Sequence, residues 1–300
     1  MTIRNLTFPF KLIHSLWKAG RIVRKFKPDV AIGVGGYASG PTLNMAARRG
    51  IPTVLQEQNS FPGVTNRLLA KKAHKICVAY DGMERFFPKE NMVQTGNPVR
   101  AEFFQNLNDK KEEACEYFNF EKSKKTIFIV DGSLGARTMN QAMEAGHKLL
   151  KSNPDVQVIW QIGKLYIDNF GRCEAARLKN IRPFVFIDRM DLAYAMADVV
   201  IGRAGALTIS ELCLVGKPTI LVPSPNVAED HQTKNAMALV EKKAAILVKD
   251  VEAKEKMIKT ALSLLKNEEE QKTLSENISK LARPNAAEEI ARTVLKLVEK

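Results

Sequence analysis

The sequence predicts an α/β protein of two domains, each built around a parallel β-sheet. The chain has 300 residues, more than one typical domain, since most domains hold about 100–200 residues. Short apolar runs alternate with amphipathic stretches, a pattern typical of βαβ units. A turn cluster, Gly96-Asn97-Pro98, ends one such series, and a second begins near residue 126. We therefore expect domains over residues 1–99 and 100–284, followed by an amphipathic helix over 285–300.

The predicted strands fall into two groups along the chain. The first domain has runs at 30–33, 53–56 and 76–80 and a short run before Gly96. The second domain has strands at 126–130, 156–161, 184–187, 199–201, 219–222 and 246–248, with helices at 137–150, 207–215 and 232–242. The first domain opens with a helix rather than a strand. Because parallel strands expect neighbours on both sides, its sheet is predicted to be incomplete.

Charge is distributed unevenly along the chain. Residues 1–100 hold 16 Lys/Arg and 5 Asp/Glu, whereas residues 101–300 hold 30 and 28. A basic face suits nucleic acid or an anionic membrane, or is simply solvated. Nucleic acid is disfavoured because the basic region lacks aromatic stacking platforms. No apolar run reaches the ~20 residues of a membrane-spanning helix, and no signal peptide is evident, so a cytoplasmic location is expected. The four cysteines form no metal-binding pair, and no metal is expected.

The N-terminal helix has more apolar surface than one packed face requires. Residues 1–27 contain no acid and carry seven basic residues: Arg4, Lys11, Lys18, Arg21, Arg24, Lys25 and Lys27. A first apolar stripe, expected in the core, comprises Leu12, Leu16, Ala19, Val23 and Phe26. A second line is formed by Ile13 and Trp17, preceded by Phe8 and Phe10. We expect this second line, with Lys18 and Arg21, to dock on an anionic membrane; the alternative is a wholly buried helix.

Three polar loops follow strands of the second domain. Asp131-Gly132-Ser133-Leu134-Gly135-Ala136 opens a helix whose free N–H groups suit a diphosphate, although the same pattern also fits an ordinary tight turn. Gly202–Glu211 also opens a helix, and Glu211 could accept hydrogen bonds from a ribose or merely complement the helix dipole. In the third loop, residues 223–235, His231 and Gln232 suit sugar hydroxyls, although a capping role fits His231 as well. Loops at the carboxyl ends of parallel strands are expected to meet at one crevice.

The first domain contains two further candidate segments. Residues 33–41 follow a strand and precede a helix, and they include Gly35, Gly36 and Tyr37, a second candidate phosphate cradle. The next strand is followed by the hydrogen-bonding residues Glu57, Gln58 and Asn59.

Together these motifs, with Gly96–Arg100, resemble the MurG family of GT-B glycosyltransferases over nearly the whole chain. The resemblance implies two Rossmann-like domains facing a cleft, with residues 285–300 completing the first domain. It implies transfer of N-acetylglucosamine from UDP-N-acetylglucosamine, held by residues 100–284, to undecaprenyl-pyrophosphoryl-N-acetylmuramyl-pentapeptide (lipid I), giving lipid II of peptidoglycan synthesis. The acceptor and the membrane would face residues 1–99. A peripheral location on the cytoplasmic face of the plasma membrane, partners from the cell-wall or division machinery, and no cofactor are also implied.

The resemblance also assigns roles to single residues. Arg100, Gly132, Ser133 and Gly135 would lie near the diphosphate, Ile187 at the uracil and Glu211 at the ribose. His231 and Gln232 would meet the sugar, and Asn59 would reach the cleft from the other domain. The nucleotide and diphosphate would contact the loop and helix start formed by Gly205, Ala206, Leu207, Thr208, Ile209 and Ser210. Gly35, Gly36, Tyr37, Glu57 and Gln58 would lie on the acceptor side.

Two features depart from the family pattern. Asp131 stands where the family usually has glycine, and a carboxylate there would repel a diphosphate unless it points away. The family also begins with a strand and a Gly-rich loop ending in histidine, which residues 1–30 do not match. We therefore expect a shortened, poorly active chain with no identifiable catalytic residue. The expected reaction is inverting and metal-independent, since no Asp-x-Asp motif occurs. The alternatives are a non-catalytic nucleotide-sugar-binding fragment, another GT-B lipid glycosyltransferase, or a UDP-sugar epimerase.

Overall fold

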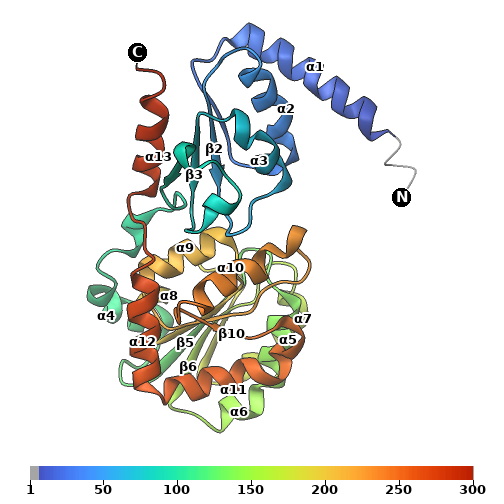
Figure 1. Cartoon of the computed structure of the whole chain (residues 1–300). Helices are drawn as coiled ribbons and strands as arrows, with labels where there is room; N and C mark the ends of the chain where they lie inside the picture. The colour runs from blue at the N-terminus through green and yellow to red at the C-terminus, as the bar shows by residue number, and fades with distance from the viewer. Residues whose placement is uncertain (1–6, 300) are drawn as a thin grey trace. The chain divides into compact units, whose positions relative to one another are not determined.

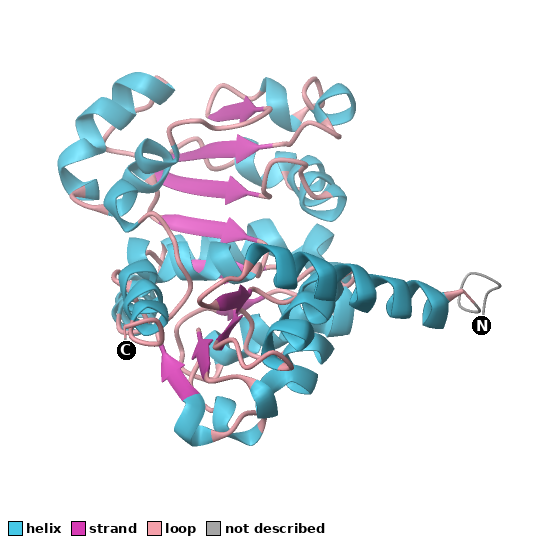
Figure 2. Cartoon of the chain, turned by 90° about the horizontal axis from the view of Figure 1, so that it is seen from above, coloured by secondary structure: helices cyan, strands magenta, loops and turns pink. Residues whose placement is uncertain are grey.

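The computed structural model describes residues 7–299, so Arg4 of the basic N-terminal set lies outside the described residues. The chain divides into two units, residues 1–98 with 285–300 and residues 99–284 (Figure 1). Each unit is built on one parallel sheet, and helices (cyan) flank the strands (magenta) in Figure 2. The predicted α/β class with two parallel sheets is therefore confirmed.

The first unit contains four parallel strands in the order β1-β2-β3-β4. Alternate side chains of a strand point to opposite faces, so Leu55 and Ile76 face one side, and Val54 and Cys77 the other. Helices α2 and α3 cover the first face, and Val294 of α13 packs on the second. The elements are β1 (Ala31–Gly33), β2 (Thr53–Glu57), β3 (Lys75–Val78), β4 (Met92–Gln94), α2 (Gly36–Ala47), α3 (Val64–Leu69) and α13 (Ala286–Leu295).

Helix α1 (Phe8–Phe26) packs against α2. Its buried residues are Ala19, Gly20 and Val23, and a Cβ on Gly20 would lie only 2.9 Å from Met45 Cε. The predicted core stripe is therefore wrong at both ends, because Leu12 is exposed and Phe26 is 77% exposed. Small residues let the two helices approach closely, and the longer side chains at the ends of the stripe extend past the contact.

The second unit contains six parallel strands in the order β10-β9-β8-β5-β6-β7. Ile127 and Ile129 of β5 pack towards α5 and α11, whereas Phe128 meets Tyr194 of α8 edge to face, with ring centroids 5.2 Å apart. The strands are β5 (Lys125–Val130), β6 (Val156–Gln161), β7 (Ile181–Phe184), β8 (Val199–Gly202), β9 (Thr219–Leu221) and β10 (Ile246–Leu247). The helices are α4 (Lys111–Phe118), α5 (Arg137–Ala145), α6 (His147–Lys151), α7 (Ile167–Phe170), α8 (Met190–Met196), α9 (Ala206–Val215), α10 (His231–Val240), α11 (Ala253–Leu265) and α12 (Glu268–Ser279).

Strand β7 corrects the sequence prediction, which placed it at residues 184–187. The apolar run Phe184-Val185-Phe186-Ile187 looks more strand-like than the segment containing Arg182 and Pro183. Pairing with β6 nevertheless sets the register, with Pro183 opposite Trp160. The proline is tolerated because β7 is an edge strand.

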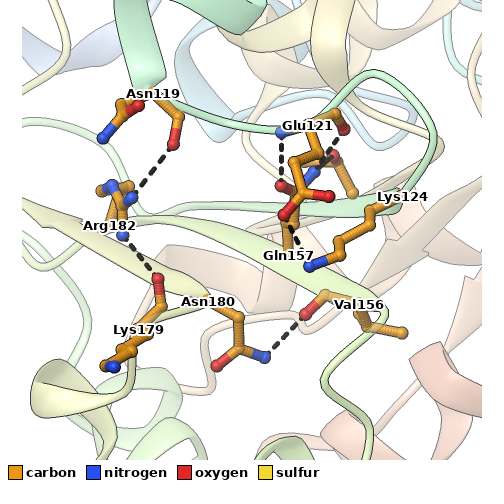
Figure 3. Close-up of polar contacts among 9 residues, drawn as sticks. Asn119, Glu121, Lys124, Val156, Gln157, Lys179, Asn180 and Arg182 are labelled. Atoms are coloured by element: carbon orange, nitrogen blue, oxygen red, sulfur yellow. Dashed lines mark hydrogen bonds and ion pairs between the residues drawn. The ribbon is translucent and has the colours of Figure 1, made fainter.

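Side-chain hydrogen bonds to main-chain groups stabilise the second sheet at the amino ends of its strands (Figure 3). The Gln157 amide accepts from the Glu121 N–H at 2.7 Å and donates to the Glu121 carbonyl at 3.0 Å. The Arg182 guanidinium donates to the carbonyls of Asn119 and Lys179. These bonds hold the segment after α4 against β6 and β7. The loops that line the cavity described below all lie at the opposite, carboxyl end of these strands.

Short 3-10 helices lie in the connections. They are η2 (Ala70–Lys72), η3 (Met83–Arg85), η4 (Lys89–Asn91), η5 (Ala101–Phe104), η6 (Leu107–Lys110), η7 (Ala175–Arg177), η8 (Ala228–Asp230) and η9 (Asp250–Glu252).

Candidate functional site

The strand order of the second sheet reverses between β5 and β8. From this pair, β6 and β7 extend one way and β9 and β10 the other. Open parallel sheets bind ligands at such a switch point, outside the carboxyl ends of the strands. A cavity of about 430 Å³ lies there, and the loops after β5, β6, β8, β9 and β10 all contribute to it. Its lining includes Asp131, Gly132, Gly135, Thr138, Tyr166, Arg203, Gly205, Thr208, Ser224, Asn226, Gln232 and Asp250.

The loop after β5 is pressed against the loop after β6. Gly135 has φ +86°, and a Cβ there would lie 2.1 Å from the carbonyl oxygen of Ile162. Gly163 makes the reciprocal contact, since its Cβ would lie 2.3 Å from Gly135 Cα. Main-chain bonds from Lys164 to Ser133 and from Leu165 to Leu134 join the two loops. The glycines thus allow the backbone contact that shapes one wall of the cavity.

The loop after β8 leads into α9, whose N-cap is Gly205. Helix N-termini present free N–H groups and partial positive charge, which favour an anion. Gly205 and Thr208 line the cavity, so the start of α9 borders it. Ser210 donates to the Ala206 carbonyl within the helix, and Ile209 is buried in the core.

A partly buried polar network lines the cavity. The Arg203 guanidinium donates to Asp250 at 2.5 Å and to the Val222 carbonyl at 2.9 Å. Thr138 donates to the other Asp250 oxygen at 3.0 Å. Asp131 stands beside this network, and burial raises the pKa of its carboxyl to about 8. This raised pKa favours the uncharged form of the carboxyl, which would lessen the expected charge conflict with a diphosphate.

The third loop, after β9, is held by Gln232, whose Oε1 accepts from the Ser224 N–H at 2.8 Å. Its Nε2 group is the donor that Gln232 can offer to a ligand. Just before it, Glu229 and Asp230 both have left-handed φ near +54°, a strained conformation for residues other than glycine. His231 Nδ1 is buried and has no hydrogen-bond partner among residues 7–299.

Five residues predicted from the sequence therefore line the cavity: Gly132, Gly135, Gly205, Thr208 and Gln232. Other predicted residues of the same unit are not part of its lining: Arg100, Ser133, Ile187, Ala206, Leu207, Ile209, Ser210, Glu211 and His231. Ile187 is 2% exposed and its N–H donates to Gln161. Glu211 is partly buried, which raises the pKa of its carboxyl. Their proposed ligand contacts stay predictions.

Sequence reasoning missed Gly163, Tyr166, Thr138 and Asp250. Gly163 could have been predicted, because it is a glycine that closely follows a predicted strand. Asp250 gave none, since it joins the cavity only through the position of the two-residue strand β10 at the sheet edge.

In the first unit, the predicted acceptor-side residues occupy two loops at strand ends. Gly35 and Gly36 have positive φ and open α2, and Tyr37 is 92% exposed. The buried Glu57 carboxylate accepts from Asn66 Nδ2 at 2.8 Å and from the main-chain N–H groups of Asn59 and Gly63. The Gln58 carbonyl accepts from Asn97. Glu57 therefore shapes the loop that carries Gln58 and Asn59.

The outer side of α1 combines apolar and basic groups. Phe8, Phe10, Ile13 and Trp17 are all exposed, with Trp17 at 57%. The Arg21 guanidinium lies 4.8 Å from the centre of the Trp17 ring. A shallow groove along the helix is lined by His14, Trp17, Lys18, Arg21, Ile22, Arg24 and Lys25. Within residues 7–299, no helix has the length and apolar character needed to cross a membrane.

Comparisons with known proteins cover nearly all of the chain. The C-terminal domain of glycosyltransferase family 28 matches residues 126–290, and the N-terminal domain of that family matches residues 1–78. A Bacteroides fragilis protein named UDP-N-acetylglucosamine--N-acetylmuramyl-(pentapeptide) pyrophosphoryl-undecaprenol N-acetylglucosamine transferase is 54% identical over 99% of this chain and 78% of its own length.

Solved structures agree with the sequence matches. A crystal structure of Acinetobacter baumannii MurG has a TM-score of 0.80 and 28% identity, covering 96% of this chain and 79% of that one. A UDP-GlcNAc 2-epimerase from Neisseria meningitidis has a TM-score of 0.67 over 99% of this chain and 84% of that one. Its identity is only 14%, so it shares the fold alone. Given the two matched domains and the extent of the identity, this chain belongs to the MurG family within glycosyltransferase family 28.

Proposed function

We propose that the protein transfers N-acetylglucosamine from UDP-N-acetylglucosamine to lipid I, giving lipid II for peptidoglycan synthesis. The observation that carries this is the 54% identity, over 99% of the chain, to a transferase named for that reaction. The cavity at the switch point of the second sheet supports it, because it joins two helix N-termini to polar side chains. Nothing in the sequence or the fold favours an epimerase over the transferase.

The donor diphosphate is proposed to lie where α5 and α9 begin, with the loop glycines allowing its close approach. Helix N-termini and cationic side chains would stabilise the charge that develops on UDP as it leaves. Arg203 is already paired with Asp250, so it stabilises the cavity more than it offers free charge. Arg100 remains the proposed cation for the diphosphate, and Glu211 the proposed ribose acceptor. The 4-hydroxyl of the acceptor would attack the anomeric carbon with inversion.

The first unit is proposed to face the membrane and the acceptor. The exposed apolar line of α1 is flanked by basic residues, which is the composition of a helix that lies in a membrane interface. Each basic residue near an anionic surface adds about 1 kcal/mol. This favours a peripheral location at the cytoplasmic face of the inner membrane, where a lipid-linked acceptor would be reached. Partners from cell-wall synthesis or division stay a prediction of the family resemblance.

A transfer assay tests the proposal directly. This chain is incubated with labelled UDP-N-acetylglucosamine and a lipid I analogue, and lipid II formation is followed by chromatography. We expect product with the lipid I analogue and none with an analogue that lacks the 4-hydroxyl. Donor binding without product would favour the nucleotide-sugar-binding fragment, and epimerised UDP-sugar would favour the epimerase.

A further inference from the structure

Asp131 is a buried carboxyl that the proposed transfer reaction does not use. It follows β5 directly and lines the cavity at the switch point. The residue is 8% exposed, and neither carboxylate oxygen has a hydrogen-bond partner among residues 7–299. An ionised carboxylate in such a place is unstable, because it has lost water and only the Ala136 amide approaches it as a donor, without forming a well-aligned hydrogen bond.

The charged groups around Asp131 do not neutralise it. Arg203 faces it from the loop after β8, but this guanidinium is shared by Asp250 and the Val222 carbonyl. Asp250, at the start of η9, adds a like charge, and Arg137 opens α5 at the cavity wall. Burial is the largest influence and raises the pKa of Asp131 to about 8, against the opposing effects of Arg203 and the Ala136 amide. We therefore expect the carboxyl of the free protein to be protonated at neutral pH.

We propose that a nucleoside diphosphate entering this cavity is bound together with one proton on Asp131, so that donor affinity falls as the pH rises. The inference rests on the proposed donor site. A diphosphate adds negative charge to a cavity with few counter-charges, which disfavours ionisation of the carboxyl still further. Linkage then requires the converse, namely that ionising Asp131 weakens diphosphate binding.

The expected coupling between UDP binding and proton uptake depends on how far Asp131 is ionised at each pH. Near pH 7 the carboxyl of the free protein is already protonated, so little proton is taken up. At pH 8.5 most of it is ionised, and binding should take up more than half a proton per UDP. Above pH 8 the affinity should fall by up to about tenfold per pH unit, the limit for one linked proton.

Calorimetry in two buffers of different ionisation enthalpy measures this uptake on the full chain. UDP is titrated at pH 7.0 and pH 8.5 into wild type, Asp131→Asn and Asp155→Asn. Asp155 is a matched control, because it is an exposed aspartate in the turn before β6, at the other end of the strands. Asp131→Gly is the second variant should the amide perturb folding. UDP is almost fully ionised at both pH values, since such phosphates titrate near pH 6.

Wild type and Asp155→Asn should take up the proton at pH 8.5, whereas both Asp131 variants should take up almost none and bind equally well at both pH values. No uptake by wild type, or the same uptake by the Asp131 variants, would overturn the coupling while leaving the donor site intact. Failure of UDP to bind wild type at either pH would overturn the donor site itself, and the coupling with it.

Discussion

The contact between the loops after β5 and β6 predicts unequal costs for two similar substitutions. Gly132 and Gly135 both have positive φ, at +68° and +86°. Alanine at either position should cost about 1–2 kcal/mol for the left-handed backbone. A Cβ on Gly132 meets nothing within 4 Å, whereas a Cβ on Gly135 meets the Ile162 carbonyl at 2.1 Å and Gly163 Cα at 3.1 Å. Forcing these backbones apart should add about 1–3 kcal/mol or more.

We therefore expect Gly132→Ala to lower the free energy of unfolding by about 1–2 kcal/mol and Gly135→Ala by about 2–5 kcal/mol. Urea unfolding can be followed by fluorescence in a Trp17→Phe background, because Trp160 of the second unit is then the sole tryptophan. Gly135→Ala should also weaken UDP binding, since the displaced loop forms a cavity wall. Equal midpoints for the two variants would refute the view that backbone contact, rather than φ alone, requires glycine at 135.

Four further outcomes are expected. Asn140→Ala should destabilise the second unit by about 2–4 kcal/mol in the same unfolding assay, because it removes the partner of both Trp160 Nε1 and the Ile162 carbonyl; a change under 1 kcal/mol would contradict the role of this bridge. Glu211→Ala should weaken UDP binding about 10–100-fold by calorimetry, the worth of a charged hydrogen bond, and an unchanged affinity would remove Glu211 from the ribose site. Trp17→Glu should reduce co-sedimentation with anionic liposomes, with Trp17→Phe as the control; binding indifferent to salt, lipid charge and this change would contradict membrane docking. The raised pKa of Asp131 contributes stability that is present below about pH 4 and is lost as the pH rises to about 8. The melting temperature of wild type should therefore fall relative to that of Asp131→Asn over this window, and parallel curves of melting temperature against pH would argue against the raised pKa.

The fold was predictable because its signals are local. Strands such as Lys125–Val130 and Val199–Gly202 are short apolar runs followed by glycine and a helix, and these runs were found within one or two residues. Strand β7 was misplaced because its register depends on β6, which no local pattern reports. Leu12 and Phe26 were wrongly expected in the core because helical spacing gives a face but not the extent of its contact with α2.

The site was predictable only in part, for a different physical reason. The glycine loops could be recognised from the sequence, because glycines follow the predicted strands directly. Which loops share one cavity depends on the order of strands in the sheet, and that order brought Asp250 and Tyr166 beside Gly132. The protonation of Asp131 likewise arises from burial by distant segments. From the sequence it could be recognised only as an acid where a glycine is usual.

The first unit is discontinuous along the chain, and this has a consequence for its biogenesis. Val294 of α13 covers the face of the sheet that contains Val54 and Cys77. During synthesis the strands of this sheet leave the ribosome long before the helix that covers them, and the whole second unit is translated in between. One apolar face of the nascent sheet therefore stays exposed until α13 has emerged from the ribosome. We therefore expect the final folding step of the first unit to be a long-range one, with a transiently exposed apolar face of the kind that chaperones recognise.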